Sequence, residues 1–280
     1  MEIISVDDLT EQLNGLARTY YKSISVDSSY AGEYEYISKI VKELNLTAGF
    51  VVDVAASDGV TQSCTLGFFK DPEWQGLAVE MNPISFSKLA FVYSNFENAK
   101  LARSRVVPKS ICPLLRGFEV PRNFDLLNLD IDSYDLDVID AMLSGGFRPK
   151  IISMEINEKI PPTIFFSVNY DDGHYWKGDH FFGCSLAAAA KVVRPYGYIL
   201  ESLQYNNAIF VRSDLGLNIF QDLNVVSAYE SGYKNRIDRK RLFPWNEDVE
   251  CLLEDTEEKS MEFTKQLFKK HTGMFELYIV

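Results

Sequence analysis

The sequence has 280 residues, of which 46% are hydrophobic and 24% charged. These proportions are typical of a globular protein and exclude a disordered or low-complexity chain. The net charge of −12 repels nucleic acid phosphates and anionic membrane surfaces at long range, so we do not expect partners of either kind. A chain of this length forms two domains or fills a single α/β domain.

We expect neither a secretory signal nor a membrane span. Residues 1–8 contain no basic segment followed by an apolar one. The longest apolar candidate, residues 186–193, is far shorter than a membrane helix and is interrupted by Lys191. The four cysteines are widely spaced and form no CxxC pair: Cys64, Cys112, Cys184 and Cys251. This usage is typical of buried reduced thiols and disfavours a cysteine-based zinc site, so we predict a cytoplasmic protein.

Hydrophobic periodicity predicts the elements in chain order. Two helices come first, over residues 6–23 and 33–46. The order strand, helix, strand then repeats. The predicted strands cover residues 50–55, 76–80, 100–107, 124–130, 150–155, 196–202 and 207–212. The helices between them cover residues 83–96, 134–144 and 185–193, and a last amphipathic helix covers residues 247–270.

This alternation predicts an α/β fold with a doubly wound, mostly parallel sheet of seven strands. Only a short turn separates the last two strands, so they should pair antiparallel. A parallel sheet that ends in an antiparallel hairpin is the outline of a class I methyltransferase. The predicted domains are an N-terminal helical extension over 1–47, a Rossmann-like domain over 48–215 and a C-terminal extension over 216–280. Residues 158–183 form a long connection of the kind that builds lids or substrate walls.

Acidic and small side chains follow the first two strands, where ligands bind in doubly wound sheets. Residues 53–59 lack the GxGxxG signature, and Asp53 and Asp58 would repel a pyrophosphate. The two acids suit a cationic ligand such as S-adenosylmethionine. Glu80, at the end of the second strand, is placed to accept both ribose hydroxyls of a nucleoside. The alternatives are an ordinary strand-to-helix turn and a solvated glutamate.

Hard oxygen ligands follow the fourth and fifth strands. Asp130 and Asp132 end one strand, and Glu155 and Asn157 end the next. Adjacent strand ends would bring them together, and such ligands suit Mg²⁺ or Mn²⁺. The cation would lower the pKa of a substrate hydroxyl.

The alternative for the same segment is a structural one. Asp132 or Ser133 would cap the following helix, and Asp135 and Asp137 would complement its dipole. We assign Asp135 and Asp137 to this structural interpretation.

Two of the three histidines lie in the polar, aromatic connection after the fifth strand. His174 or His180 would act there as a general base, or serve a structural purpose instead. The aromatic residues of 165–182 fit sugar stacking, and they equally fit a hydrophobic core.

Several of these motifs, in this order, resemble the FkbM-type family of S-adenosylmethionine-dependent methyltransferases. The resemblance covers residues 48–215, through segments 52–60 with 63–65, 79–83, 129–135, 154–157, 182–186 and 207–211. It implies a Rossmann-like fold, S-adenosylmethionine as methyl donor and O-methylation of sugars, glycans or natural products. On its motifs, the cofactor residues are Asp53, Ala55, Ser57, Asp58, Ser63 and Glu80. Ala55 is a departure, because the generic motif has glycine there.

Two hypotheses follow from these patterns. The first is an O-methyltransferase that acts on a hydroxyl of a sugar, glycan or related small molecule, with a divalent metal. Asp130, Asp132 and His180 would be its catalytic residues. The second is a non-catalytic Rossmann-like binding or assembly protein that has lost methyl transfer, which Ala55 and the scarcity of histidines motivate. Cofactor affinity distinguishes the two, and a homo-oligomer is compatible with both.

Overall fold

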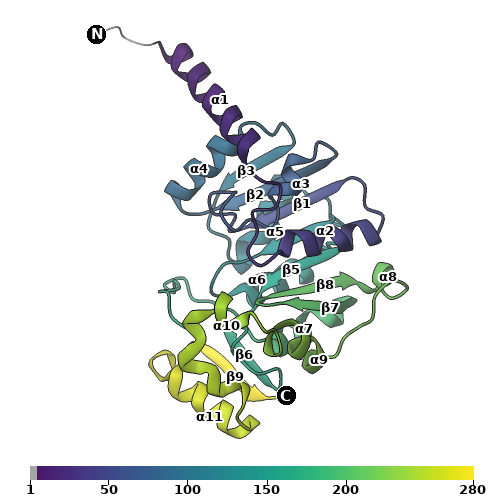
Figure 1. Ribbon diagram of the computed structural model, residues 1–280, viewed down its shortest axis with the longest axis vertical. Coiled ribbons are helices and arrows are strands. Elements are labelled where there is room, and N and C mark those ends of the chain that lie inside the picture. Colours follow the sequence, from purple (N-terminus) through teal and green to yellow (C-terminus); the bar gives the residue numbers. More distant parts are fainter. Residues whose placement is uncertain (1–4) are drawn as a thin grey trace. The chain divides into compact units, whose positions relative to one another are not determined.

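The computed structural model describes residues 5–280 (Figure 1). The chain divides into two compact units, one ending at Arg105 and one beginning at Val106. Within the described residues, seven strands form a sheet of order β3-β2-β1-β4-β5-β8-β7. The first three strands of this order belong to the first unit and the other four to the second.

The first unit contains the elements that precede and surround the first strands. They are α1 (Val6–Ser23), α2 (Glu33–Glu43), β1 (Gly49–Val54), α3 (Leu66–Lys70), β2 (Trp74–Glu80), α4 (Pro83–Tyr93) and β3 (Ala99–Arg103). β1 pairs parallel with β2, and β2 with β3. Val51 and Val52 are fully buried, as expected for a parallel strand covered on both faces. α4 begins after Asn82, whose side chain accepts hydrogen bonds from two N–H groups of the first turn.

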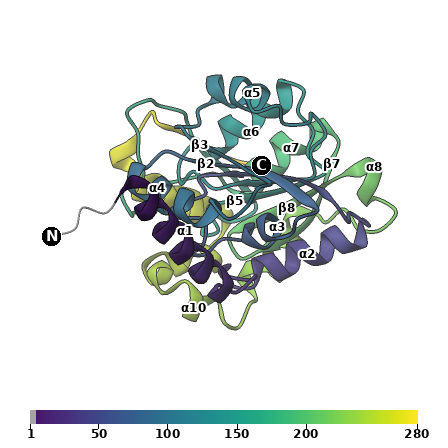
Figure 2. The same cartoon turned by 90° about the horizontal axis from the view of Figure 1, so that it is seen from above.

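The second unit contains the other sheet strands and their helices. These are α5 (Pro108–Gly117), β4 (Leu126–Leu129), α6 (Asp135–Ser144), β5 (Ile151–Glu155), α7 (Leu186–Val193), β7 (Tyr198–Gln204) and β8 (Asn207–Arg212). β4 and β5 are parallel, whereas β8 runs antiparallel to both β5 and β7. The predicted mostly parallel sheet with an antiparallel last strand is therefore confirmed. Figure 2 shows α5, α6 and α7 side by side along the strands of this unit.

A second, two-stranded sheet was not predicted. β6 (Ile164–Val168) lies in the connection after β5, and β9 (Phe275–Ile279) lies near the C-terminus; the two pair antiparallel. Phe166, Phe181 and Phe268 form a buried cluster beneath them. The aromatic residues at 165, 166 and 181 therefore belong to a core, which was one of the two readings of this segment.

The prediction of one C-terminal helix over residues 247–270 is wrong. A 3₁₀ helix, η3 (Pro244–Leu253), is followed by a break and then by α11 (Glu257–Leu267). The break occurs because Thr256 is extended, with φ −69° and ψ 160°. The remaining short helices are η1 (Arg194–Tyr196), α8 (Ser213–Gly216), α9 (Val225–Tyr229), the π-helical η2 (Glu230–Lys234), α10 (Arg239–Leu242) and η4 (Lys269–His271).

No helix in the described range 5–280 combines the length and apolarity that a membrane crossing requires. All four cysteines are free thiols. Cys64 and Cys184 are buried as expected, Cys112 is half-buried, and Cys251 is exposed, contrary to expectation.

Candidate functional site

The loop after β1 has a backbone conformation that residues other than glycine rarely adopt. Ala55 has φ +68° and Ser57 has φ +51°, both in the left-handed region. The N–H groups of Ala55 and Ala56 donate to the carbonyl oxygen of Val79 on β2, at 2.9 and 3.0 Å. Backbone held in such conformations is concentrated at ligand sites, because the surrounding structure must stabilise it.

Gly59 ends this loop, and a larger residue there would force neighbouring side chains to move. Its φ is +75°, and a Cβ built there would lie 2.5 Å from Leu89 and 2.6 Å from Tyr93. The Tyr93 hydroxyl donates to the Gly59 carbonyl oxygen at 3.1 Å. The loop is thus packed against α4 as well as tied to β2.

Asp53 and Ser63 are both engaged within the first unit. Oδ2 of the buried Asp53 accepts a hydrogen bond from the Thr65 hydroxyl at 2.6 Å. Oγ of Ser63 accepts from the N–H groups of Thr65 and Leu66, at 3.3 and 3.1 Å. Ser63 therefore holds the start of α3, and Thr65 orients the Asp53 carboxylate.

Glu80 links the end of β2 to the loop after β1. Its Oε2 accepts from the N–H of Ser57 at 2.9 Å and its Oε1 from the N–H of Asn82 at 2.6 Å. A carboxylate has about four lone-pair sites, so each oxygen keeps capacity for a ligand hydroxyl. The structure thus brings Glu80 and Ser57 together at the carboxyl ends of β1 and β2.

Asp58 organises the far end of the same loop. Its carboxylate accepts from the N–H groups of Val60 and Thr61, at 3.0 and 2.7 Å, and from the Thr61 hydroxyl. Partial burial opposes ionisation, but the hydrogen bonds outweigh it and hold the pKa of Asp58 below its usual value. Asp58 is accordingly an ionised loop residue at neutral pH.

In the second unit, three carboxylates converge at the ends of β4 and β5. Asp130, Asp132 and Glu155 each offer an oxygen, and these oxygens lie within 4.8 Å of one another. Oε1 of Glu155 accepts from the side chain of Asn206 at 3.0 Å. Oε2 of Glu155 is buried and has no hydrogen-bond partner among the described residues. A buried acceptor without a donor is costly, and a cation in the cluster would satisfy it.

Crowding of these acids shifts their proton affinities. Burial, and then the negative charges of Asp130 and Asp132, raise the pKa of Glu155 well above its usual range. Burial and the neighbouring Asp135 raise the pKa of Asp132 to about 6. A bound divalent cation would reverse this effect, because it favours the ionised carboxylates. The cluster therefore fits a metal such as Mg²⁺ or Mn²⁺.

Asp135 shapes the turn that presents these acids. It is fully buried and accepts from the N–H groups of Ile131 and Ser133, at 2.7 and 3.2 Å. Burial raises its pKa to about 6 despite these hydrogen bonds. Asp132 has φ +60° within the turn. The alternative that Asp132 or Ser133 caps α6 is wrong, because the N-cap is Tyr134 and it makes no side-chain capping bond.

Asn157 anchors the connection that follows β5. It is fully buried, and its Nδ2 donates to the carbonyl oxygens of His180 and Phe182, both at 2.9 Å. Its Oδ1 is buried and has no partner among residues 5–280. The amide therefore positions residues 180–182 and leaves one acceptor unused.

His180 lies at a pocket that also contains two of the three clustered acids. The pocket has a volume of about 360 Å³ and includes Asp132, Glu155 and His180. Nε2 of His180 lies 3.0 Å from Oδ1 of Asp248 on η3. Sequence reasoning missed Asp248, because nothing in its local pattern connects η3 with a histidine 68 positions earlier.

Aromatic side chains form the wall of this pocket. They are Trp176, Phe182, Phe243 and Trp245. The indole N–H of Trp176 donates to the Asp179 carbonyl oxygen at 2.6 Å, which fixes the ring, yet the side chain remains exposed. Lys159 is buried beside Glu158, with 3.4 Å between Nζ and Oε1, and its Nζ lies 4.1 Å from the centre of the Phe182 ring.

His174, the other candidate base, lies away from these acids. Its ring packs edge-on against Phe181, with 5.4 Å between the ring centres, in the aromatic core. Burial lowers its pKa. His174 does not line the pocket that contains His180.

No protein-family model matches the sequence, and no curated protein matches it. Solved structures resemble the fold at low identity. The N-terminal domain of EvdMO1 with SAH bound is 10% identical, with 64% of this chain and 80% of that chain covered and a TM-score of 0.40. An S-adenosylmethionine-dependent methyltransferase from Clostridium acetobutylicum is 13% identical, with 71% and 98% covered and a TM-score of 0.40.

A third neighbour is an O-methyltransferase family protein from Burkholderia thailandensis. It is 13% identical, with 63% of this chain and 55% of that chain covered and a TM-score of 0.39. At these values the likeness concerns the fold alone. The residues of this chain, rather than its neighbours, carry the functional proposal.

Proposed function

We propose that the protein is an S-adenosylmethionine-dependent O-methyltransferase of the FkbM type. The acceptor is a hydroxyl of a sugar, glycan or related small molecule, and a divalent metal assists. The observation that carries the proposal is the sheet, in which antiparallel β8 lies between β5 and β7 and acidic residues end or follow β1, β2, β4 and β5. Ligands of doubly wound sheets bind at these carboxyl ends.

The first unit would bind the methyl donor. Glu80 would accept hydrogen bonds from the ribose hydroxyls, while the buried Asp53 carboxylate and the Ala55–Ser57 backbone would face the methionine part. The ionised Asp58 adds negative charge on the same loop. This charge favours a ligand that carries ammonium and sulfonium groups over one that carries a pyrophosphate.

The second unit would bind the acceptor and activate it. Asp130, Asp132 and Glu155 would hold the metal, with Oδ1 of Asn157 as a further oxygen ligand. When bound, the metal would lower the pKa of an acceptor hydroxyl. The exposed rings of Trp176 and Trp245 would stack on the apolar face of a sugar, in a pocket large enough for a small acceptor.

The reaction is a displacement at the methyl carbon. An acceptor oxygen forms a bond to this carbon as the carbon–sulfur bond breaks, and the sulfonium becomes the uncharged thioether of S-adenosylhomocysteine. The hydroxyl proton passes to His180, whose ring Asp248 orients. Alignment of oxygen, carbon and sulfur supplies much of the rate, because it replaces a bimolecular encounter by a positioned one.

Calorimetric titration with S-adenosylmethionine and S-adenosylhomocysteine tests the cofactor half of the proposal. We expect a dissociation constant in the micromolar range, or about −8 kcal/mol. Glu80→Gln should weaken binding at least tenfold, whereas Glu73→Gln, at an exposed site just before β2, should leave it unchanged. If neither nucleoside binds, the non-catalytic alternative replaces the enzyme.

A further inference from the structure

A histidine attaches segment 170–180, which carries the pocket residues Trp176 and His180, to the aromatic core. Within this described stretch His174 is the only buried residue, with 8% of its surface exposed. A turn presents it, because its N–H donates to the Asp171 carbonyl oxygen at 3.2 Å. The apolar attachment of the segment therefore depends on one titratable side chain.

A second histidine, His271 of η4, completes this attachment. Its ring stacks on Phe181 with 3.8 Å between the ring centres and 3° between the planes, and His174 packs edge-on against the same ring. The centres of the two imidazole rings lie 6.2 Å apart. We call His174, Phe181 and His271 the histidine latch, because they join the connection after β5 to the C-terminal region.

The latch is built for uncharged histidines. The Nε2 atoms of His174 and His271 are buried, and neither has a hydrogen-bond partner among residues 5–280. A neutral imidazole tolerates this environment, since its Nε2 can be the unprotonated nitrogen. An imidazolium carries an N–H at both nitrogens, so protonation would bury a charged donor without an acceptor, which is costly.

The charges near His271 offset this cost only in part. Oδ2 of Asp179 lies 3.8 Å from its Nε2, but the same oxygen accepts a hydrogen bond from Lys270 at 2.8 Å. Lys270 and His174 both disfavour a positive charge on this ring. Burial is the largest effect and lowers the pKa of His271.

The charges that act on His174 lie on its own connection. Asp179 and Asp171 favour its protonation, whereas Lys177 opposes it. Burial again outweighs the acids and lowers the pKa of His174. Both histidines of the latch are therefore neutral at pH 7.

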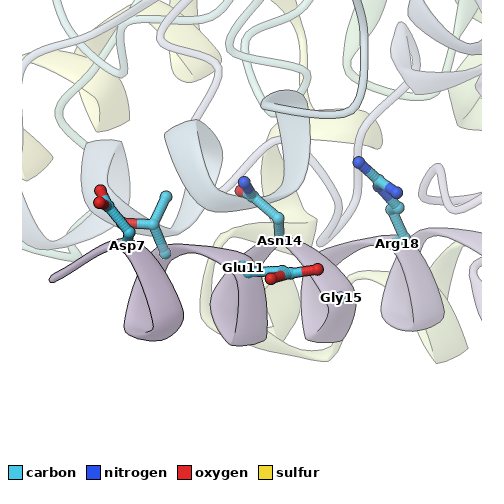
Figure 3. Close-up of a pocket in the computed structure, with 6 residues that line it drawn as sticks. Asp7, Glu11, Asn14, Gly15 and Arg18 are labelled. Carbon is cyan, nitrogen blue, oxygen red and sulfur yellow. The ribbon is translucent and has the colours of Figure 1, made fainter. Parts of the chain in front are cut away.

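Burial distinguishes these histidines from charged side chains at other pockets. Figure 3 shows Asp7, Glu11 and Arg18 along α1, where they line a pocket and are exposed. Water solvates exposed groups whether they are charged or neutral, so the packing around them need not change with pH. The buried Nε2 atoms of His174 and His271 have no such access to water.

We propose that the histidine latch is acid-sensitive: it holds segment 170–180 on the aromatic core at neutral pH and releases the segment when His174 and His271 take up protons. Repulsion between two imidazolium rings would add to the effect. Release would move Trp176 and His180 away from the pocket that they line. The inference concerns packing within the second unit and does not depend on the proposed methyltransferase activity.

The direction of the pH dependence follows from linkage. The closed latch binds protons less tightly than the released segment does, so closure weakens as the pH falls below about 6.5, the ordinary pKa of histidine. Each histidine changes the opening equilibrium by up to about tenfold per pH unit. The acids Asp132 and Glu155 act in the opposite direction, because their raised pKa values make the fold more stable in acid.

Hydrogen exchange of the full chain, followed by mass spectrometry from pH 7.5 to 5.5 and corrected for the intrinsic exchange rate, tests the proposal. We expect the protection of segment 170–180 to fall about tenfold over this range, while β4 and α6 stay protected. His174→Phe keeps an aromatic ring that cannot take up a proton, so its segment should stay protected throughout. His180→Gln, at the third histidine of the chain, is the control and should retain the pH dependence.

Protection of segment 170–180 that does not change with pH would overturn the proposal. A pH dependence that persists in His174→Phe, or one that disappears in His180→Gln, would overturn it as well. An equal loss of protection in β4 and α6 would indicate unfolding of the whole unit instead of release of the segment.

His271→Phe provides a second test, which does not require His174→Phe to fold. Phenylalanine can stack on Phe181 as the imidazole does, so the segment should remain closed at neutral pH and lose less protection in acid than the unaltered protein. Far-UV circular dichroism shows whether each variant is folded. An unchanged loss of protection in folded His271→Phe would exclude His271 from the latch and contradict the proposal.

Discussion

Ala55 carries a strain that a single methyl group causes. Its φ of +68° costs an L-residue about 1–2 kcal/mol relative to glycine, partly offset by the greater freedom of glycine in the unfolded chain. Ala55→Gly should therefore raise stability by about 1 kcal/mol, or a few degrees in melting temperature. It should also leave S-adenosylmethionine affinity equal or higher, since the Cβ that would crowd the ligand is gone.

Ala56→Gly is the matched control for that substitution. Ala56 is adjacent and its φ is not positive, so glycine should lower stability there. Thermal melts and calorimetric titrations of the two variants check the contrast. If both variants are destabilised equally, the loop after β1 is not strained at Ala55.

Glu155 and Asp130 should govern metal affinity and turnover together. We expect Asp130→Asn and Glu155→Gln each to reduce methyl transfer at least 100-fold and to weaken Mn²⁺ binding, while S-adenosylhomocysteine affinity stays within a few fold. The measurements are calorimetric titration with Mn²⁺, and turnover with and without EDTA. Unchanged activity in both variants would remove the metal from the proposal.

At the level of single residues, the sequence revealed the acids but not their surroundings. Glu80, Asp130 and Glu155 could be selected because each lies at the carboxyl end of a recognisable strand. Two hydrogen bonds could not be predicted, because they depend on the geometry of the turns. They are the bond from Asn206 to Glu155 and the bond from the Ile131 N–H to Asp135. The capping interpretation of Asp132 and Ser133 failed for the same reason: the N-cap of α6 is Tyr134, one or two residues later than the pattern suggests.

At the level of elements, η3 places Asp248 within hydrogen-bond distance of His180, in the connection after β5. Asp248→Asn should preserve the fold, because the side chain is 69% exposed, and should lower kcat roughly tenfold or more with little change in acceptor KM. His180→Gln should lower kcat further, and the double variant should be no worse than His180→Gln alone, since Asp248 acts through His180. Steady-state kinetics of the three variants test this expectation, with Glu247→Gln as an exposed neighbouring control. If the losses in kcat are additive, Asp248 does not act through His180.

Strongly periodic elements were predictable, and those defined by distant pairing were not. The strands of the main sheet are near their predicted positions, because buried parallel strands form continuous apolar runs. β6 is a buried, mostly apolar run of five residues, but it lies inside the long connection after β5, where no strand was predicted. β9 is only partly buried, and its pairing with β6 identifies it as a strand. The predicted C-terminal helix was too long, because the spacing of apolar residues does not reveal the break at the extended residue Thr256.

For the whole molecule, the acidic cluster should make stability depend on pH and on metal. Without metal, the folded state holds protons on Asp132 and Glu155 more tightly than the unfolded state does. Stability should therefore fall as the pH rises from about 4 through about 6, and further where Glu155 ionises, by up to about 1.4 kcal/mol per pH unit for each group. Mn²⁺ should abolish this fall, because it favours the ionised carboxylates.

Melting temperatures from pH 5.5 to 7.5, in EDTA and in Mn²⁺, test this dependence away from the isoelectric point near 4.8. The stabilisation by Mn²⁺ should grow with pH. An Asp132→Asn, Glu155→Gln double variant should lose most of the metal effect, although the buried Asp135 keeps its own contribution. A metal effect that does not vary across this range would contradict the expectation.

The pairing of β6 with β9 has a consequence for how the molecule is made. The pairs β1–β2 and β2–β3 of the first unit join strands that are close in sequence, so these pairs can form while synthesis continues. β6 must wait, because Ile164 pairs with Ile279 and the ribosome delivers that residue much later. Until then the connection that carries His180 and Trp176 has no strand to close on, so nascent chains should expose it to proteases and chaperones.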